Sequence, residues 1–274
     1  FFMALCGRPL QAGFALRQMA ASGLLGAYLP EFQAIQGIVR YEDFHSYPVD
    51  EHTLRAVEAL AGVSELGGSV GEFLERTLEH VRDPHLLVLA ILFHDLGKAT
   101  GEEHVEEGVR LSRQICERMG LNEDDTERVS FLVRHHMLMT QMSIYRDTDD
   151  ISIVSSFAYT MKTDERLREL LLLSYADLSA VGPGVWNDWK GALLLKLFLK
   201  TERLLLGQQR LSHEEEHWRR PKLKAVCELL PAQDPQHVAG VLQDLGERYF
   251  LAFSPDQIAW HLSLLAEARE PLLK

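Results

Sequence analysis

The sequence predicts an all-α protein. Almost every apolar pattern in its 274 residues has helical spacing, and no alternating stretch bounded by turn residues is long enough to indicate a sheet. Hydrophobic residues make up 46% of the chain, which is ample for a core without covalent cross-links. Three widely spaced cysteines without a CxxC motif, Cys6, Cys116 and Cys227, favour reduced thiols and a cytoplasmic protein.

The charge and the apolar runs argue against two classes of partner. A formal net charge of −12, with no dense Lys/Arg patch, disfavours general binding to nucleic acid. The apolar runs are far shorter than the roughly 18 to 20 residues of a membrane span, and nothing near Phe1 resembles a signal peptide. The chain begins with residues typical of a helix interior, which favours a piece of a longer protein.

The first part of the chain carries short amphipathic patterns. Residues 9–27 indicate one or two helices, and we expect 31–48 to be irregular. Asp50 is a candidate N-cap for a helix that starts at Glu51. This start places His52 in the first helical turn.

Capping signals place the next two helices. Ser69 and Glu72, three residues apart, form a capping box that predicts a helix start. Asp83 and Pro84 begin a strongly apolar helix, with proline in its first turn. Gly97 stands where a left-handed residue would end that helix, so the polar residues just before it lie at a helix end.

The rest of the chain continues the helical pattern. Amphipathic helices are predicted over 102–119 and 122–139, and two more begin near Asp149 and Thr163. A Gly-Pro-Gly break follows, and the C-terminal part is then predicted to hold helices at 186–208, 213–230 and 255–268, with 231–235 as a linker.

His94 and Asp95 end the apolar run that starts at Leu86. An imidazole and a carboxylate there cost several kcal/mol of desolvation unless a cation, a charge partner or hydrogen bonds compensate them. A metal ion is the leading candidate, because other histidines at helix ends and a second aspartate complete a nitrogen and oxygen donor set. Such a set suits Mn, Fe, Zn, Co or Ni and admits Mg more weakly. The candidate ligands are His52, His94, Asp95, His104, His135, His136 and Asp177.

This number of ligands exceeds the needs of one tetrahedral ion and suffices for two. Two ions would lower the pKa of a bridging water and present hydroxide to a phosphorus atom. The natural partition gives one ion His52, His94, Asp95 and Asp177 and the other His104, His135 and His136, with Asp95 bridging.

Three residues are candidates for catalysis, namely Asp95, Lys98 and His136. Lys98 follows the His-Asp turn and is placed to bind a phosphoryl oxygen as charge develops. Neighbours on a helix point about 100° apart, so His135 and His136 do not both reach one ion without distortion. His136 is the less secure ligand and is a candidate to hydrogen-bond a substrate phosphate or to orient a ligand.

The order of these residues resembles the ligand series of the HD-domain metal-dependent phosphohydrolases. More narrowly, the chain is similar to the central region of the bacterial bifunctional uridylyltransferase/uridylyl-removing enzymes, which modify the PII nitrogen-regulatory protein. The stretches that carry this resemblance occur in the right order and are 44–54, 94–98, 176–178, 186–187, 249–251 and 258–261.

The resemblance implies both an architecture and an activity. The architecture is an HD-domain helical core at 49–182, a helical lead-in at 1–48 and a C-terminal helical extension at 183–274. The activity is hydrolysis of the UMP–tyrosine bond of uridylylated PII by metal-activated hydroxide, with two divalent ions, Mn or Mg. In this family a nucleotidyltransferase domain and ACT domains flank the region, and the chain lacks the transferase motif. Departures at Pro48, at 99–101 and at Val105 concern the phosphate side of the site.

Two other functions stay open on the sequence. A regulatory or scaffolding module would bind metal or nucleotide without turnover, and a broader HD phosphohydrolase would act on small nucleotides without a protein partner. The run 213–217 matches the zinc-protease pattern H-E-x-x-H, but its acidic middle and a Ser212/Glu215 cap favour a solvated helix start. The run 67–71 matches a nucleophile elbow, but no strand precedes it.

Overall fold

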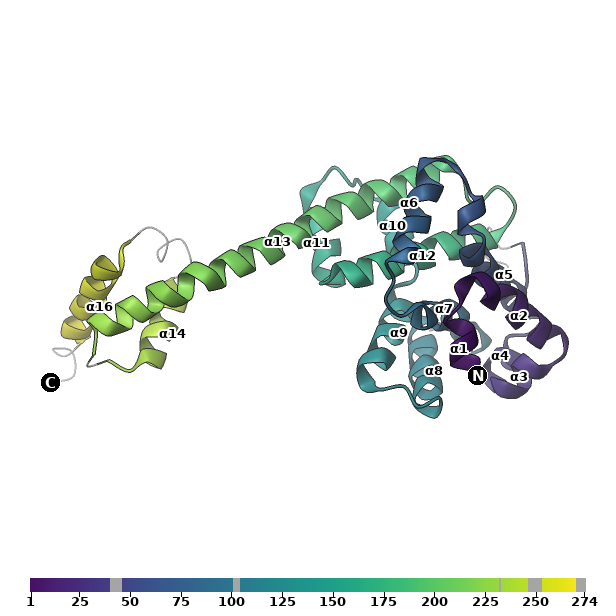
Figure 1. Ribbon diagram of the computed structural model, residues 1–274, viewed down its shortest axis with the longest axis horizontal. Coiled ribbons are helices and arrows are strands. Elements are labelled where there is room, and N and C mark those ends of the chain that lie inside the picture. Colours follow the sequence, from purple (N-terminus) through teal and green to yellow (C-terminus); the bar gives the residue numbers. More distant parts are fainter. Residues whose placement is uncertain (40–45, 101–103, 232, 246–252, 270–274) are drawn as a thin grey trace. The chain divides into compact units, whose positions relative to one another are not determined.

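The computed structural model describes residues 1–39, 46–100, 104–231, 233–245 and 253–269, without the side chains of 208–221, 243–244 and 266–269 (Figure 1). Every regular element in these ranges is a helix, which confirms the all-α prediction. The chain divides into two compact units, Phe1–Leu205 and Leu206–Lys274, and all the predicted site residues lie in the first. Among the described residues, no helix is both long and apolar enough to cross a membrane.

Four short helices come first: α1 (Phe2–Cys6), α2 (Pro9–Ala21), α3 (Leu24–Tyr28) and α4 (Pro30–Ala34). The prediction of an irregular segment over 31–48 is wrong at its start. Pro30 supplies the fixed φ of a first helical turn, and α4 forms there. Residues 40–45 lie outside the described part of the chain.

Helix α5 (Val49–Ala61) carries His52 in its first turn and starts two residues before the predicted Glu51. The predicted cap, Asp50, lies inside the helix, and its carboxylate instead accepts a hydrogen bond from the backbone N–H of Gly37 at 3.0 Å. Arg17 of α2 pairs with Glu51 at 2.9 Å. These two contacts tie the preceding chain to the turn that presents His52.

The capping box predicted at Ser69 and Glu72 is wrong. Helix α6 (Gly68–Glu79) follows η1 (Val63–Glu65) and starts one residue before Ser69, without a side-chain cap. Gly67 occupies the N-cap position with a φ of 63°, in the left-handed region that favours glycine. The chain therefore enters this helix through the backbone conformation of Gly67.

Helix α7 (Pro84–Phe93) begins at the predicted proline, and every side chain from Leu86 to Phe93 is buried. The short helix η2 (Leu96–Ala99) follows. Gly97 lies inside η2 and does not have the left-handed conformation predicted for it. The absence of a side chain instead allows the start of α8 to pack directly against the backbone of Gly97, because a Cβ there would lie 1.8 Å from the carbonyl oxygen of His104.

Five helices follow in the first unit: α8 (His104–Arg118), α9 (Glu123–His135), α10 (Leu138–Tyr145), α11 (Ile151–Met161) and α12 (Asp164–Val181). The side chains of Asn122, Asp150 and Thr163 cap α9, α11 and α12, which confirms the predicted starts. The single helix predicted over 122–139 is two helices, with the break at His136. Helix α12 packs along α5, and the hydroxyl of Tyr175 donates to the carbonyl of Ala59 at 3.2 Å.

The last helices are α13 (Asp188–Leu229), α14 (Pro235–Leu245) and α16 (Pro255–Arg269). Helix α13 is continuous where two separate helices were predicted, and the boundary between the two compact units falls inside it. The side chains of 213–217 and the stretch 249–251 lie outside the described residues. The domain limits at 48 and 182 stay predictions. The second unit has a small apolar core of its own, made by Val226, Leu230, Val238, Leu242, Ile258, Ala259 and Leu262.

Candidate metal centre

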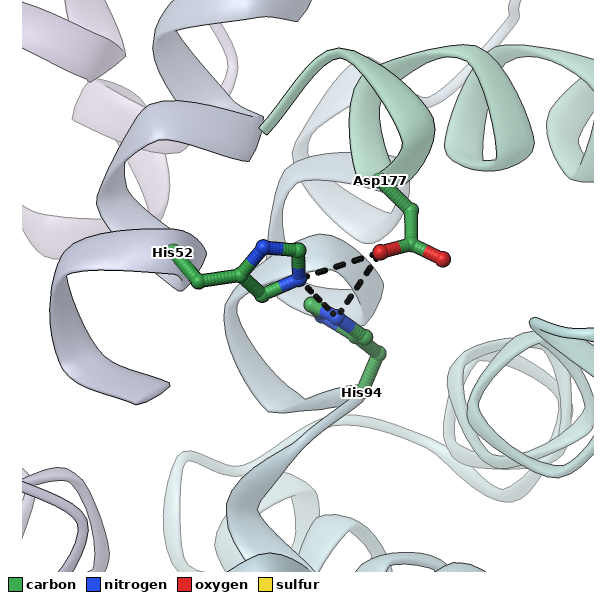
Figure 2. Close-up of side chains that lie close together, drawn as sticks. All are labelled: His52, His94 and Asp177. Atoms are coloured by element: carbon green, nitrogen blue, oxygen red, sulfur yellow. Dashed lines mark hydrogen bonds and ion pairs between the residues drawn. The ribbon is translucent and has the colours of Figure 1, made fainter. Parts of the chain in front are cut away.

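Three helices bring two histidines and an aspartate to one point. His52 comes from the first turn of α5, His94 from the residue after α7, and Asp177 from α12, and Figure 2 shows their side chains pointing toward one another. His52 Nε2 lies 3.0 Å from Asp177 Oδ1 and 3.2 Å from His94 Nε2. One donor atom from each residue lies within 4.8 Å of the other two, a spacing that suits a shared cation.

Asp95 lies beside this trio and is buried together with Lys98. Its Oδ2 atom is 3.3 Å from His94 Nε2 and 3.6 Å from His52 Nε2, and Lys98 Nζ lies 2.9 Å from the same oxygen. Burial opposes ionisation of Asp95, but the charges of His94, Lys98 and His52 outweigh it and hold the pKa of this carboxyl well below its usual range. Asp95 is therefore a carboxylate at neutral pH.

Backbone carbonyls fix the orientation of two imidazole rings. His94 Nδ1 donates to the carbonyl of Ile91 at 2.7 Å, which leaves Nε2 as the atom that faces the cluster. His136 Nδ1 donates in the same way to the carbonyl of Val133 at 2.7 Å. The two rings meet edge to face with centroids 5.2 Å apart. Both rings therefore present Nε2 as the available atom.

The charges in the cluster favour a cation. Burial disfavours a charged His94, yet Asp95 and Asp177 raise its pKa to about 9. Burial likewise opposes ionisation of Asp177, yet His52 and His94 lower its pKa. Burial and the charge of His94 lower the pKa of His136, which is neutral at pH 7. Two ionised carboxylates thus lie among imidazoles in a largely buried site, where the Asp177 side chain is 18% exposed.

The donor set fits a divalent metal ion. Asp95 Oδ1 is buried and has no hydrogen-bond partner among the described residues, which is costly for a carboxylate oxygen unless a cation takes its lone pairs. His52 and His94 turn Nε2 atoms toward each other, an arrangement that a shared ion stabilises. Imidazole nitrogen and carboxylate oxygen suit Mn, Fe, Zn, Co or Ni and admit Mg.

A cavity of about 300 Å³ adjoins the cluster. Its lining contains five of the predicted site residues, Asp95, Lys98, His104, His136 and Asp177. His104, at the start of α8, and His136, just after α9, therefore face the same space as both metal-site carboxylates. The lining also includes Thr140, Tyr145 and Lys190, which no motif or spacing in the sequence singles out.

His135 is not brought to this cavity. Its ring packs on Phe131 with ring centroids 4.5 Å apart, and it lines a second cavity with Arg134 and Arg166. The reason is helical geometry, since consecutive residues point about 100° apart, and it is His136 that faces the cluster. The geometry does not support one ion held by both His135 and His136. Of the three histidines predicted for the second ion, only His104 and His136 line the cavity at the cluster.

Residues 49–180 match the family model of the HD domain. This range contains the clustered histidines and aspartates together with Lys98, His104 and His136. This match, the all-α fold and the clustered donor atoms support a metal-dependent hydrolase of the HD domain family.

Three curated relatives extend the similarity to nearly the whole chain, and each is a bifunctional uridylyltransferase/uridylyl-removing enzyme. The protein from Phenylobacterium zucineum is 36% identical over 271 residues, which is 96% of this chain and 28% of the relative. The protein from Nitrosococcus oceani is 36% identical over 93% of this chain and 29% of its own length. The protein from Novosphingobium aromaticivorans is 35% identical over 94% of this chain and 28% of its own length. The chain thus spans less than a third of the length of these relatives.

Proposed function

We propose that the chain removes uridylyl groups from a tyrosine of uridylylated PII by metal-dependent hydrolysis of the phosphodiester. The observation that carries the proposal is the convergence of His52, His94, Asp95 and Asp177, with a buried oxygen of Asp95 left for a cation. The substrate is supported by the similarity, over nearly the whole chain, to proteins named as uridylyl-removing enzymes.

In this proposal His52, His94, Asp95 and Asp177 hold one divalent ion, Mn or Mg. Such an ion, when bound, polarises a phosphoryl oxygen and lowers the pKa of water toward neutrality. A second ion is part of the same proposal, with Asp95, His104 and His136 as the residues beside it. The flanking nucleotidyltransferase and ACT domains of a longer parent chain, and a cytoplasmic location, also stay proposals.

Lys98 supplies positive charge at the wall of the cavity. Its side chain is almost fully buried and its ammonium group lies 2.9 Å from Asp95 Oδ2, so its position is fixed before the substrate arrives. Negative charge grows on the phosphoryl oxygens during the displacement, and a preorganised cation stabilises that charge without reorganising. Lys98 therefore acts on the phosphoryl group.

His136 has a different role from phosphate binding. Its Nδ1 proton is used on the carbonyl of Val133, so the neutral ring offers a lone pair on Nε2 to the cavity. A lone pair accepts a proton or binds a cation and does not donate to a phosphate oxygen. The lowered pKa of His136 disfavours the imidazolium that such donation requires. His136 is thus proposed to accept a proton from the attacking water or to ligate an ion.

The reaction balances with water as the only co-reactant. The water oxygen forms a bond to phosphorus, the bond between phosphorus and the tyrosine oxygen breaks, and the phenolic oxygen regains a proton. The products are UMP and the unmodified tyrosine side chain. Tyr145, which is 74% exposed, and Lys190 also line the cavity, and we propose that they contact the uridylyl group or the PII surface.

The test is UMP release from uridylylated PII by the chelator-stripped chain, with and without Mn²⁺ or Mg²⁺. We expect release only with the ion, and a loss of at least about a hundredfold in Asp95→Asn. Asp149→Asn, which changes an exposed aspartate outside the cavity, is the matched control and should keep full activity.

Three results would go against the proposal. A folded chain that releases no UMP with any divalent ion contradicts it. Binding of metal without turnover indicates a regulatory module, and hydrolysis of small nucleotides in place of uridylylated PII indicates the broader phosphohydrolase class.

A further inference from the structure

A second cavity, of about 500 Å³, is formed by residues of α8 and α9, the end of α11 and the start of α12. It shares no lining residue with the cavity at the metal centre. We call it the basic cavity after its cationic side chains. Its lining includes Arg113, Arg134, His135, Tyr159, Lys162 and Arg166.

The lining of the basic cavity is positively charged. Among the described residues of the lining, four cationic side chains stand against one carboxylate, that of Glu127, in a chain whose formal net charge is −12. Like charges gathered around a hollow repel one another unless an anion lies among them. The cavity is therefore complementary to an anion, although the surface as a whole is not.

Two of the four cations are already paired and two are not. Arg113 pairs with Glu127, and Arg134 pairs with Glu106. Arg166 lies with its guanidinium carbon 4.2 Å from the centre of the Phe131 ring, and neither it nor Lys162 forms an ion pair with any carboxylate of the described residues.

The acidic residues nearest to Arg166 in the chain are engaged elsewhere. Asp164 pairs with Arg168 at 2.8 Å, and Glu165 contacts Arg128 at 3.6 Å. Arg166 and Lys162 therefore keep donors for a ligand.

The backbone presents Lys162 in an unusual conformation. Its φ of 64° makes it the one non-glycine residue with positive φ among the described residues. Side chains other than glycine, asparagine and aspartate rarely adopt this conformation. The lysine caps the C-terminus of α11 and stands directly before Thr163, the cap of α12, so the junction of the two helices fixes its position.

The size and an aromatic edge define the class of ligand. A volume of about 500 Å³ lies within the range of small-molecule pockets and exceeds what a single phosphate ion needs. Tyr159 is 81% exposed at the lining and offers a ring face, whereas Phe131 already contacts His135 and Arg166. We propose that the basic cavity binds a nucleoside polyphosphate, with the phosphates on Lys162 and Arg166 and the base on Tyr159.

The test titrates ATP and inorganic triphosphate into the chelator-stripped chain by calorimetry, without divalent ions. We expect both to bind, with an affinity that falls as salt rises. Lys162→Asn combined with Arg166→Gln should weaken both by at least about tenfold. Tyr159→Ala should weaken ATP and leave triphosphate unchanged, because only ATP carries a base.

The matched control removes the same charge elsewhere. Arg8→Gln with Arg76→Gln changes two exposed arginines outside the cavity and should bind ATP like the parent chain. Asparagine tolerates the positive φ of Lys162, so the cavity variant should fold, and thermal unfolding verifies this.

Three results would overturn the proposal: no binding of either probe at roughly millimolar concentration, equal weakening in both double variants, or ATP binding lost in Asp95→Asn instead. The last would place the nucleotide at the metal centre. UMP release without ATP is expected to be unchanged in the cavity variant. Failure of this proposal thus leaves the hydrolase proposal standing, and the reverse also holds.

Discussion

Replacing Gly97 by alanine adds one methyl group where η2 meets α8. The new Cβ would lie 1.8 Å from the carbonyl oxygen of His104 and 2.6 Å from the backbone nitrogen of Gly108. The first distance is 1.6 Å below the 3.4 Å at which ordinary van der Waals contact begins. Both neighbours are backbone atoms, so no side-chain rotation relieves the overlap, and η2 or α8 must shift.

We expect this shift to lower the free energy of unfolding by at least about 3 kcal/mol, the upper end of the usual overpacking range. For a chain of this size the loss corresponds to a fall of roughly 6 to 12 °C in Tm. Asp95 lies two residues before Gly97, Lys98 follows it directly and His104 begins α8. UMP release should therefore fall as well. Calorimetry and the UMP assay measure the two effects.

Gly207→Ala and Gly240→Ala are the matched controls. Both glycines lie within helices, and beyond its own helical turn a Cβ at either position would meet no atom of the described residues within 4 Å. Alanine there should raise stability by about 0.5 to 1 kcal/mol. A Gly97→Ala chain that melts within about 1 °C of the parent and keeps full UMP release would refute the packing argument.

Three further substitutions have defined outcomes. Arg128→Met removes the ion-pair partner that lies 2.5 Å from buried Glu169, and it should lower the free energy of unfolding, measured with denaturant, by about 3 to 5 kcal/mol. Adding Glu169→Leu should recover most of this loss, and equal stability of the single and double variants would contradict the argument. Hydrogen bonds from two lysines lower the pKa of Asp149 to about 2. Its contribution to the stability of the fold is therefore fully present above the unfolded-state pKa of about 4 and is lost as the pH falls through 2. Asp149→Asn should therefore lower Tm at pH 6 and progressively less below about pH 4, whereas a constant difference argues against the ion pair. His136→Ala should reduce UMP release at least about tenfold while His135→Ala stays near the parent, and the reverse order contradicts the placement of the two rings.

Local signals in the sequence predicted much of the fold. Asn122, Asp150 and Thr163 cap helices where expected, because a cap depends only on backbone groups in the next turn. The apolar run before His94 predicted a buried helix for a similar reason. The order of the candidate ligands along the chain anticipated the cluster, although spacing alone does not bring residues from three helices together.

Positions set by contacts between distant segments could not be predicted in this way. Asp50 accepts a hydrogen bond from the backbone N–H of Gly37 instead of capping a helix. Gly97 allows the close approach of α8 instead of ending α7. Which of His135 and His136 faces the cluster follows from where α9 lies against its neighbours, which a sequence pattern does not state. The basic cavity is a further case, since its cations come from four helices or helix ends.

The most direct test of the metal centre is binding of Mn²⁺ to the chelator-stripped chain, followed by electron paramagnetic resonance. We expect the tightest ion to show nitrogen couplings from His52 and His94, with an affinity at least about tenfold lower in Asp177→Asn and unchanged in His135→Ala. A parent chain that binds no divalent ion, or tight binding that survives Asp177→Asn, would contradict the assignment of the four converging residues as its ligands.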